Sequence, residues 1–325
     1  MPRLTKALAV RAKAARAQTR KDLGHLRDHV INSSTLKRYV NALRYFFWWL
    51  SVTGTALPSH AVALDLIISE FIEMLWQEGE GRSFGHDTIS GICHHVPSLH
   101  GKFYGSKRLL SAWQRLELPA RAPPLTRQML LAAVELCLRR KWLWLGACLA
   151  LGFHCFLRTG EMFPLTPQHF SFDGTTARGV VRLGLTKSGQ RRGVEEASTI
   201  DCPMTGRLVQ VALLTRNPED FLIPSCAEFR KKFDTLMVDL GLSDFEFKPY
   251  SLRRGGTTFD FRQHGVLSRS TLRGRWANAR TARLYINDSL AVLTSLKLPP
   301  VVAQKLEDLE AALLRRFALA TVAPR

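Results

Sequence analysis

Four short stretches in the second half of the chain carry side chains suited to phosphate chemistry. They are residues 156–161 (FLRTGE), 186–189 (TKSG), 249–256 (PYSLRRGG) and 272–276 (LRGRW), and Tyr285 follows nine residues after the last. Arginine guanidinium groups are permanently charged, forked donors that fit the oxygens of a phosphate. A tyrosine hydroxyl attacks such a centre when its proton leaves and the oxyanion is stabilised. The set therefore predicts an electrostatic cradle for a phosphoryl group with a built-in nucleophile.

The residue types suggest a chemical role for each side chain of this phosphate site. Arg158 and Arg253 would clamp phosphate oxygens, and Trp276, which donates only through its indole N–H, suits one more oxygen. Lys187 lies in a turn-type cluster and would be a mobile proton donor, while Tyr285 would supply the attacking hydroxyl. The arginines supply the positive charge that a metal ion supplies elsewhere, and the sequence has no dense Asp/Glu cluster suited to a two-metal site. No metal or other cofactor is therefore expected.

Each of these residues also has an ordinary structural role that it would fill in an unrelated protein. Arg158 can cap the carbonyls of an apolar helix, Glu161 can be a helix ion-pair partner, and Lys187 can be a turn lysine. Trp276 and Tyr285 can be packing residues. The catalytic interpretation rests on their joint order and spacing, which an unrelated core has no reason to reproduce.

Apolar spacing in residues 31–118 predicts a small helical bundle that would precede this site. Leu36, Val40 and Leu43 recur at steps of three and four residues, which is the helical period. The aromatic run at residues 45–49 continues this spacing and is expected in the bundle core rather than on a base-stacking surface. The expected helices cover about residues 34–50, 60–77, 87–99 and 107–116.

Residues 119–124 (PARAPP) are expected to form a Pro-rich linker, because proline keeps itself and the residue before it out of a helix. Residues 125–325 then read as a second, mostly helical domain. Its β-like stretch at 180–185 leads into a turn and a basic return strand. The expected helices of this domain cover about residues 126–140, 142–157, 226–240, 251–264, 268–276 and 301–319. The predicted fold class is mainly α with a small β-sheet (α+β).

A large positive charge indicates a polyanionic partner. The 325 residues include 46 Lys and Arg against 27 Asp and Glu, which gives a net charge of +19. This excess is spread over both halves, as expected for a protein that lies along a nucleic acid, with an anionic membrane surface as the second choice. The hydrophobic fraction of 46% excludes a disordered tail protein. Candidate phosphate contacts, each with a solvated surface charge as its alternative, are Lys37, Arg38, Arg44, Lys102, Lys107, Arg108, Arg254 and Arg275.

Residues 1–30 form a basic N-terminal tail in this interpretation. The first 21 residues hold seven basic residues and no acidic one, which favours a solvated tail or a DNA-tracking arm over organelle transit. No membrane span is expected, because the longest apolar run, residues 142–157, is shorter than the ~20 residues that a spanning helix needs. No signal peptide is expected either. The six cysteines lack metal-ligand spacing and are expected to be reduced, buried, intracellular thiols.

The order of the candidate residues resembles that of the tyrosine recombinase (phage integrase) family. This order is Arg, Lys, an x-x-Arg motif headed by Tyr250 instead of the usual His, Gly-x-Trp, and a terminal Tyr. The resemblance is most specific between Lys248 and Tyr285, and it agrees more loosely from residue 33 onward. It implies a helical core-binding, DNA-binding domain over residues 31–118, followed by a tyrosine recombinase catalytic domain over residues 125–325.

The resemblance also implies a reaction. Tyr285 would attack the scissile DNA phosphate and leave a 3′-phosphotyrosyl link. Arg158 and Arg253 would hold the non-bridging oxygens, and Lys187 would protonate the departing 5′ oxygen. Because strand exchange conserves the phosphodiester energy, no cofactor is implied.

Three further positions complete the implied site. Trp276 stands where the family has His or Trp, and Glu161 stands at the acidic position that braces the site. Tyr250 is the departure from the pattern. A phenol of pKa ~10 is a poorer general base near neutral pH than an imidazole, so Tyr250 is expected to orient Tyr285 or to bind a phosphate oxygen.

The implied function is site-specific recombination or integration of double-stranded DNA by a mobile-element-type enzyme. Two alternatives remain open. One is type IB topoisomerase-like relaxation of DNA. The other is DNA binding by a catalytically inactive descendant of a recombinase, which the replacement of the usual His by Tyr250 supports. The C-terminal helix either packs on its own domain or docks into a neighbouring protomer, which would give a tetramer on DNA. The expected location is with the DNA, in a nucleus or a bacterial nucleoid, with organelle targeting by the N-terminus as a further possibility.

Overall fold

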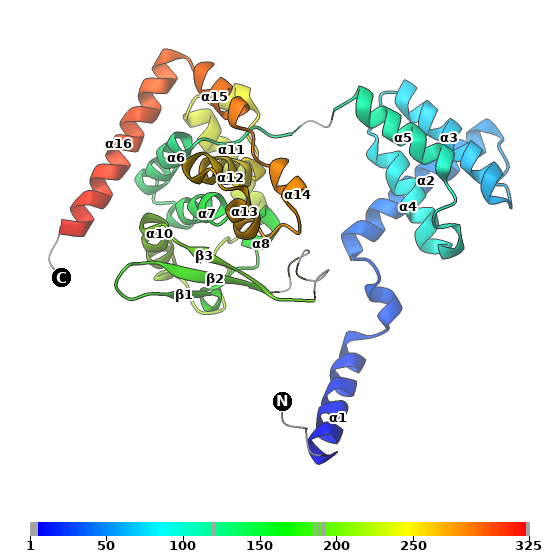
Figure 1. Cartoon of the computed structure of the whole chain (residues 1–325), viewed down its shortest axis with the longest axis horizontal. Helices are drawn as coiled ribbons and strands as arrows, with labels where there is room; N and C mark the ends of the chain where they lie inside the picture. The colour runs from blue at the N-terminus through cyan, green and yellow to red at the C-terminus, as the bar shows by residue number, and fades with distance from the viewer. Residues whose placement is uncertain (1–5, 119–120, 185, 187–188, 190–192, 323–325) are drawn as a thin grey trace. The chain divides into compact units, whose positions relative to one another are not determined.

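Two compact units make up the chain, residues 1–120 and residues 121–325. The computed structural model describes residues 6–118, 121–184, 186, 189 and 193–322. Both units are mainly helical, and the described part of the second carries one small antiparallel sheet (Figure 1). The expected fold class is therefore confirmed. Within the described ranges, no helix combines the length and the apolar character that crossing a membrane requires.

The first unit is a helical bundle with its own apolar core. Phe46, Ile68 and Phe71 are fully buried in this core. The aromatic run is divided, however, because Phe47 and Trp48 are about half exposed, at 49% and 55%. The helices of this unit are α1 (Lys6–Leu23), η1 (Leu26–His29), α2 (Ser33–Thr53), α3 (Ala61–Gln77), α4 (Ser83–His95), η2 (Pro97–Leu99) and α5 (Tyr104–Leu116).

Local signals explain where two of these helices begin. The side chain of Asn32 accepts a hydrogen bond from the Thr35 amide at 2.8 Å, which is an N-cap that starts α2. At the start of α5, the carboxylate of Asp65 accepts from the amides of Gly105 and Ser106 at 2.7 and 3.0 Å. This second cap joins α3 to α5, so the bundle is fixed by a polar contact as well as by its core.

The basic N-terminal segment is helical over Lys6–Leu23. It has no apolar stripe, so the periodicity that identifies amphipathic helices gives no signal there. Its many alanines, which have the highest helix propensity, account for α1 instead. Its described side chains, from Val10 onward, lie almost entirely in solvent, as expected for a basic arm.

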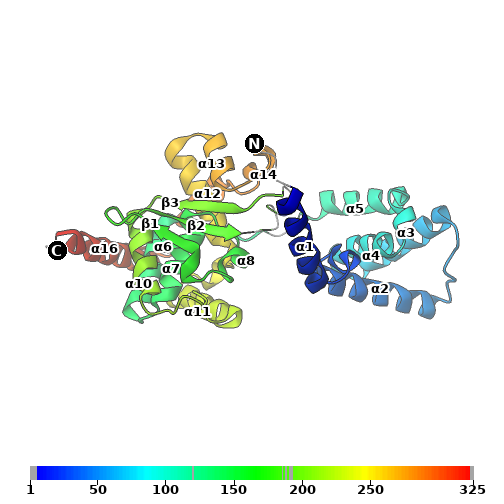
Figure 2. The ribbon, with the colours of Figure 1, turned by 90° about the horizontal axis from the view of Figure 1, so that it is seen from below.

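The second unit packs its helices on both sides of a buried pair, α6 and α7, with the sheet at one end (Figures 1 and 2). The strand order is β1-β2-β3, with Val181 of β2 opposite Phe170 of β1 and Ser198 of β3. The elements preceding the sheet and within it are α6 (Arg127–Arg139), α7 (Leu143–His154), α8 (Thr159–Met162), η3 (Pro167–His169), β1 (Phe170–Phe172), β2 (Gly179–Gly184) and β3 (Glu196–Ile200). Those that follow it are α10 (Pro203–Leu213), α11 (Cys226–Asp239), η4 (Ser243–Phe245), α12 (Tyr250–His264), α13 (Leu267–Arg273), α14 (Ala279–Arg283), α15 (Asp288–Leu296) and α16 (Pro300–Val322).

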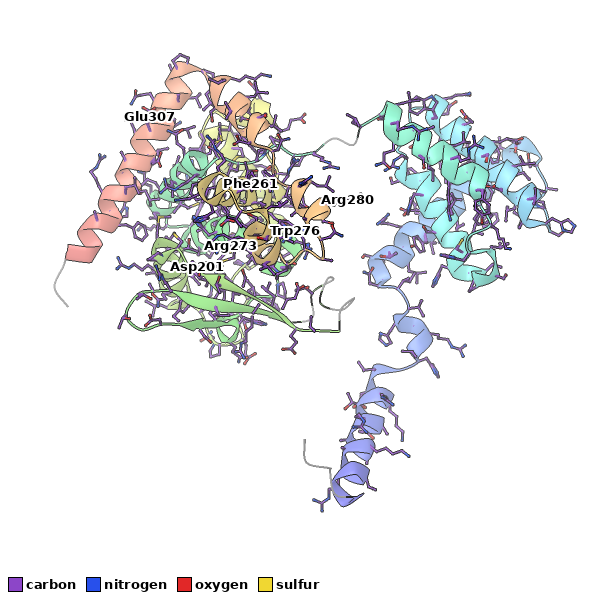
Figure 3. The ribbon with its side chains drawn as sticks, in the orientation of Figure 1. Asp201, Phe261, Arg273, Trp276, Arg280 and Glu307 are labelled. Carbon is purple, nitrogen blue, oxygen red and sulfur yellow. The ribbon has the colours of Figure 1, made fainter. Side chains whose placement is uncertain are left out.

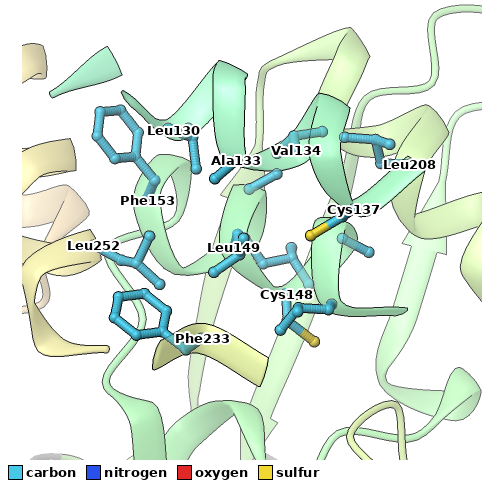
Figure 4. Close-up of a cluster of buried hydrophobic side chains, with 14 of the residues drawn as sticks. Leu130, Ala133, Val134, Cys137, Cys148, Leu149, Phe153, Leu208, Phe233 and Leu252 are labelled. Atoms are coloured by element: carbon cyan, nitrogen blue, oxygen red, sulfur yellow. The ribbon is translucent and has the colours of Figure 1, made fainter. Parts of the chain in front are cut away.

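The main core of this unit is one large apolar cluster, and a smaller cluster of Phe156, Trp276 and Ala282 is separate from it. Figure 4 shows side chains of α6, α7 and α12 meeting in the large cluster, among them Leu130, Phe153 and Leu252, all fully buried. Cys137 and Cys148 belong to the same cluster and burial raises their pKa, so they are packing residues. The expectation that all six cysteines are buried is wrong for three of them: Cys226 is exposed on the first turn of α11, and Cys93 and Cys202 are only half-buried.

The C-terminal helix α16 packs on its own unit, against α6. Leu306, Leu309 and Leu313 are buried in the core that α6 also lines. An ion pair between Arg127 of α6 and Glu310 of α16, at 3.1 Å, reinforces this contact. The apolar face of α16 therefore packs on its own unit, which is one of the two alternatives that the sequence left open.

Gly256 sets the distance between α12 and α7. A Cβ at this position would lie 1.8 Å from the backbone oxygen of Phe153, which only a backbone shift could relieve. We expect Gly256→Ala to destabilise the protein by at least about 3 kcal/mol, the upper range for overpacking a core. Urea unfolding measures this change. The control Gly174→Ala adds its methyl to open space and should change stability by less than about 0.5 kcal/mol; equal effects of the two variants would contradict the expectation.

Candidate active site

The turn that follows α7 positions Arg158 and Glu161. Phe156 has a left-handed backbone (φ +50°), which turns the chain from α7 toward α8. The backbone amide of Arg158 donates to Glu161 Oε2 at 2.8 Å, and its guanidinium donates to Glu161 Oε1. The glutamate thus caps the short helix α8 and fixes the arginine that precedes it.

Arg253 is the most deeply buried arginine of the site. It lies one turn after Tyr250 on α12, and its side chain is completely shielded from solvent. Its two terminal nitrogens donate to the backbone oxygens of Phe156 and, at 2.7 Å, of Gly274. Burial, together with the nearby charges of Arg158 and Arg275, lowers the pKa of Arg253 to about 10, so the group remains a cation at neutral pH. A fixed cation in the interior is suited to holding an anion.

Trp276, Tyr285 and Tyr250 form an aromatic group around this cation. Trp276 lies where the chain passes from α13 to α14 (Figure 3), and its ring centroid is 4.5 Å from that of Tyr285. The Arg253 guanidinium carbon lies 4.7 Å from the Trp276 centroid and 5.2 Å from the Tyr285 centroid. The Tyr250 hydroxyl donates to the Tyr285 hydroxyl at 2.5 Å, across 35 residues of sequence.

Two buried N–H donors in this group have no partner among the described residues. They are Nε of Arg253 and Nε1 of Trp276. The indole N–H makes no hydrogen bond of ordinary geometry, although it lies close enough to the Tyr285 hydroxyl to help lower the pKa of that group. Buried donors are nearly always hydrogen-bonded in folded proteins, so an unpaired donor calls for an explanation. Two such donors beside a tyrosine hydroxyl are suited to receiving the oxygens of a phosphate.

The two hydroxyls differ in acidity. Burial raises the pKa of Tyr285, but the hydrogen bond from Tyr250 and the charge of Arg253 outweigh this effect, so the pKa lies below the usual value. Burial and the same hydrogen bond raise the pKa of Tyr250. A donor stabilises the ionised form of its acceptor, so the arrangement favours a phenolate on Tyr285 and a neutral Tyr250.

Removing the Tyr250 hydroxyl should therefore shift the pH dependence of any reaction in which Tyr285 must ionise. In Tyr250→Phe the pKa of Tyr285 rises, because the hydrogen bond that stabilises its phenolate is lost. We expect the rate of such a reaction in this variant to reach its half-maximum at higher pH than in the wild type, as measured in single-turnover reactions over a pH series. Tyr104→Phe removes an exposed hydroxyl from α5 and should leave the profile in place. A profile unchanged in Tyr250→Phe would show that this hydrogen bond does not set the acidity of Tyr285.

Glu161 connects the arginines of the site. Besides Arg158, its carboxylate contacts Arg275 Nη2 at 2.7 Å and Arg253 Nη1 at 3.8 Å. The side chains of Glu161 and Arg275 are 7% and 6% exposed. Glu161 therefore contacts three arginines, and Arg275 lies in the interior rather than on the surface, where a DNA contact was expected.

Arg254 and Arg275, both expected to contact DNA phosphates, lie in the interior. Arg254 is 4% exposed and donates to the backbone oxygen of Ala122 at 2.7 Å. Arg275 is 8% exposed, lies 3.4 Å from Glu196, and pairs with Glu161. Their charges are engaged by protein oxygens, which removes them from the set of surface contacts. The sequence gives no local signal for this, because the partners of both arginines lie far away in the chain.

The remaining expected site residues are Lys187 in the second unit and the candidate DNA contacts in the first unit. Lys187 lies outside the described residues. In the first unit, the candidate DNA contacts are all exposed, and Arg38 also pairs with Asp87, with 2.9 Å between Nε and Oδ2. The exposed set is Lys37, Arg38, Arg44, Lys102, Lys107 and Arg108.

Comparison with known proteins identifies the fold of the chain. No protein-family model and no curated protein sequence matches the chain. Among solved structures, the Tn1549 transposon integrase in complex with transposon right end DNA is similar, with a TM-score of 0.59 and 11% identity over 87% of this chain and 98% of that one. The XerH site-specific recombinase bound to palindromic difH substrate gives a TM-score of 0.53 and 13% identity over 77% and 75% of the two chains.

A lambda integrase dimer bound to a COC′ core site is similar to the same degree, with a TM-score of 0.53 and 13% identity over 88% of this chain and 82% of that one. These matches cover 77% to 88% of this chain. At such low identity, the likeness establishes the fold alone. The chain therefore has the fold of the tyrosine recombinases.

Proposed function

We propose that the protein is a site-specific DNA recombinase or integrase that breaks and rejoins DNA through Tyr285. The observation that carries this proposal is the pair of unpaired buried donors, Arg253 Nε and Trp276 Nε1, beside the Tyr285 hydroxyl. A phosphate oxygen would satisfy both donors, and the phosphorus would then lie next to a hydroxyl whose pKa is lowered. DNA-bound recombinases and integrases of the same fold support a DNA phosphate as the substrate.

The proposed reaction is a transesterification. The Tyr285 oxygen loses its proton and forms a bond to phosphorus, while the bond between phosphorus and the 5′ oxygen breaks. Lys187 supplies the proton to this leaving oxygen, and Arg158 and Arg253 stabilise the charge on the non-bridging oxygens. The product is a 3′-phosphotyrosyl link, and attack by a 5′ hydroxyl reverses the step and rejoins DNA. Because the ester energy is conserved, the cycle needs no cofactor.

Binding of the duplex is proposed to use the exposed lysines and arginines of the first unit. The side chains of α2 and α5 in this set lie in solvent, and a many-phosphate contact would account for the net charge of +19. Exchange between two duplexes requires four cut strands. With one Tyr285 in each protomer, the proposal therefore includes a tetramer on DNA, located wherever the target DNA lies.

The test is to recover DNA that becomes covalently linked to the protein. A randomised duplex pool with a nick that lets the cleaved end diffuse away is incubated with the full chain in EDTA. After denaturation, the linked DNA is sequenced and the linked peptide is identified by mass spectrometry. We expect a nucleotide 3′ end on the peptide that contains Tyr285. A link on Tyr250 would overturn the assignment of the nucleophile, and retained binding without any adduct would favour an inactive DNA-binding descendant.

A further inference from the structure

Residues 274–276, between α13 and α14, contact several groups of the candidate site. Gly274 makes room for the indole, because a Cβ at this position would collide with the Trp276 ring. The backbone oxygen of Gly274 accepts from Arg253 at 2.7 Å. Arg275 follows with a φ of +57°, in the left-handed region where glycine is unstrained and a residue with a Cβ is not. Such a conformation persists only where other contacts hold it.

The Arg275 side chain makes those contacts in the interior of the second unit. It is 6% exposed, and its Nη2 donates to Glu161 Oε2 at 2.7 Å. Its two terminal nitrogens also donate, over 3.3 and 3.4 Å, to the backbone oxygens of Cys155 and Phe156, where α7 ends. Its Nε lies 3.4 Å from Glu196 Oε2. Arg275 therefore ties residues 274–276 to the segment that leads from α7 to α8.

Glu161 is the shared partner of Arg275 and Arg158. Its Oε2 accepts from Arg275 and, at 2.8 Å, from the backbone amide of Arg158, while its Oε1 accepts from the Arg158 guanidinium. The Arg158 side chain is 28% exposed, whereas those of Glu161 and Arg275 are 7% and 6% exposed. The Arg275–Glu161 pair is thus the buried end of this chain of contacts. Its accessible end is the Arg158 guanidinium, whose charge acts on Tyr285.

Arg275 also balances the negative charge of Glu161. A buried carboxylate that loses one partner keeps its charge only at a high cost in free energy. This carboxylate lies 3.8 Å from Arg253 Nη1, so without Arg275 it would draw more strongly on Arg253 and Arg158. With Arg275 in place, the positive charge of the other two arginines remains for an anion.

We propose that Arg275 is a positioning residue that acts through Glu161 to hold the Arg158 guanidinium in place for the DNA phosphate. This inference rests on the proposed function. Glycine at residue 275 would relieve the backbone strain, and an apolar side chain would fill the same space without burying a charge. The directional contact with Glu161, rather than packing, therefore explains a strained and buried arginine at this position.

The test removes the Arg275 side chain and returns its charged group from solution. Arg275→Gly suits the φ of +57° and leaves a space that guanidinium chloride can fill at concentrations far below those that unfold proteins. Urea, a planar and uncharged molecule of similar size, is the solute control. The full chain cleaves a nicked duplex that carries the site recovered from the pool, with DNA in excess. An unfolded fraction lowers the final amount of adduct, whereas a displaced Arg158 lowers the rate constant of its formation.

We expect Arg275→Gly to form the adduct about 100-fold more slowly than the wild type, the loss typical of a reacting group that is misplaced by about 1 Å. The final amount of adduct and the Kd for DNA should change little. Guanidinium should recover most of the lost rate, and urea should recover none of it. Arg275→Asn, whose side chain also tolerates the left-handed region, should be equally slow and serves as the second variant if glycine impairs folding.

Two further variants show whether the effect passes through Glu161. Adding Arg275→Gly to Glu161→Gln should slow cleavage little beyond Glu161→Gln alone, because both changes break one interaction. Guanidinium should not rescue this double variant, since the carboxylate that would bind it is gone. Arg269→Ala is the matched control on α13. It breaks an ion pair of 3.2 Å with the buried Asp260 and should cleave at the wild-type rate with or without guanidinium.

Different outcomes test the two proposals. If the wild type forms no adduct, the proposed function fails. If the wild type forms adduct and Arg275→Gly matches its rate constant, Arg275 has no positioning role and this inference fails alone. Equal rescue by urea and guanidinium would show that filled space rather than charge matters, which also overturns the inference. If neither solute acts, the double variant decides, because fully additive losses would mean that Arg275 does not act through Glu161.

Discussion

Replacing Tyr285 with phenylalanine is expected to abolish the covalent protein–DNA adduct while leaving DNA binding nearly unchanged. The substitution removes the one oxygen that would bond to phosphorus, and removal of a catalytic nucleophile slows an enzyme by about 10⁴-fold or more. The lost hydrogen bond to Tyr250 should lower stability by only about 1 kcal/mol. The adduct is measured on denaturing gels with the nicked duplex, and binding is measured by titration at fixed salt.

Tyr250→Phe is the matched control for this experiment. It removes the other oxygen of the same hydrogen-bonded pair, so it disturbs the local structure to a similar extent. Adduct formation should persist in Tyr250→Phe, with its pH profile displaced. Adduct in Tyr285→Phe and none in Tyr250→Phe would show that the nucleophile is Tyr250.

Arg253→Lys is expected to lower the rate of DNA cleavage by about 10²- to 10³-fold, as removal of one oxyanion-stabilising donor does in other enzymes. Lysine keeps the charge but lacks the planar fork that reaches the backbone oxygens of Phe156 and Gly274. At least one of these buried oxygens then loses its donor, so stability should also fall by about 1 to 3 kcal/mol. Arg253→Ala would add a cavity, which makes lysine the better variant for kinetics.

Single-turnover cleavage, urea unfolding and DNA titration together separate these effects. The Kd for DNA should change little, because one arginine is a small part of a many-phosphate contact. Arg316→Lys, on the exposed side of α16, changes the same residue type outside the site and should cleave normally. If Arg253→Lys lost DNA binding and cleavage in equal proportion, Arg253 would be a DNA contact without a part in the chemistry.

The helices with strong apolar periodicity could be predicted from the sequence because their pattern is local. The sequence predicts helices over residues 34–50 and 60–77, and the structure has α2 over Ser33–Thr53 and α3 over Ala61–Gln77. Several helices of the second unit were not predicted. The helix α10 (Pro203–Leu213) buries Leu208, Val209 and Ala212 at helical spacing, so its pattern is present in the sequence but was not recognised. The helices α14 (Ala279–Arg283) and α15 (Asp288–Leu296) are too short to show a clear apolar period.

The candidate site was also only partly predictable from the sequence. Tyr250 and Arg253 lie one helical turn apart, so their common placement follows from the sequence once a helix is assigned. The hydrogen bond between Tyr250 and Tyr285 spans 35 residues, and neither side chain alone shows it. Its consequence, a lowered pKa for one tyrosine and a raised pKa for the other, depends on that contact and on the burial of Arg253.

The mainly helical class, the basic character and the order of the residue types suited to phosphate binding follow from the sequence alone, because each depends on composition or on spacing along the chain. Which arginines face inward depends on how the chain packs. Arg254 and Arg275 look like surface charges in the sequence, yet both are buried against protein oxygens. The partner of Arg275 in α8 lies 114 residues away, and an ion pair over that separation exists only when the chain folds and removes both charges from water.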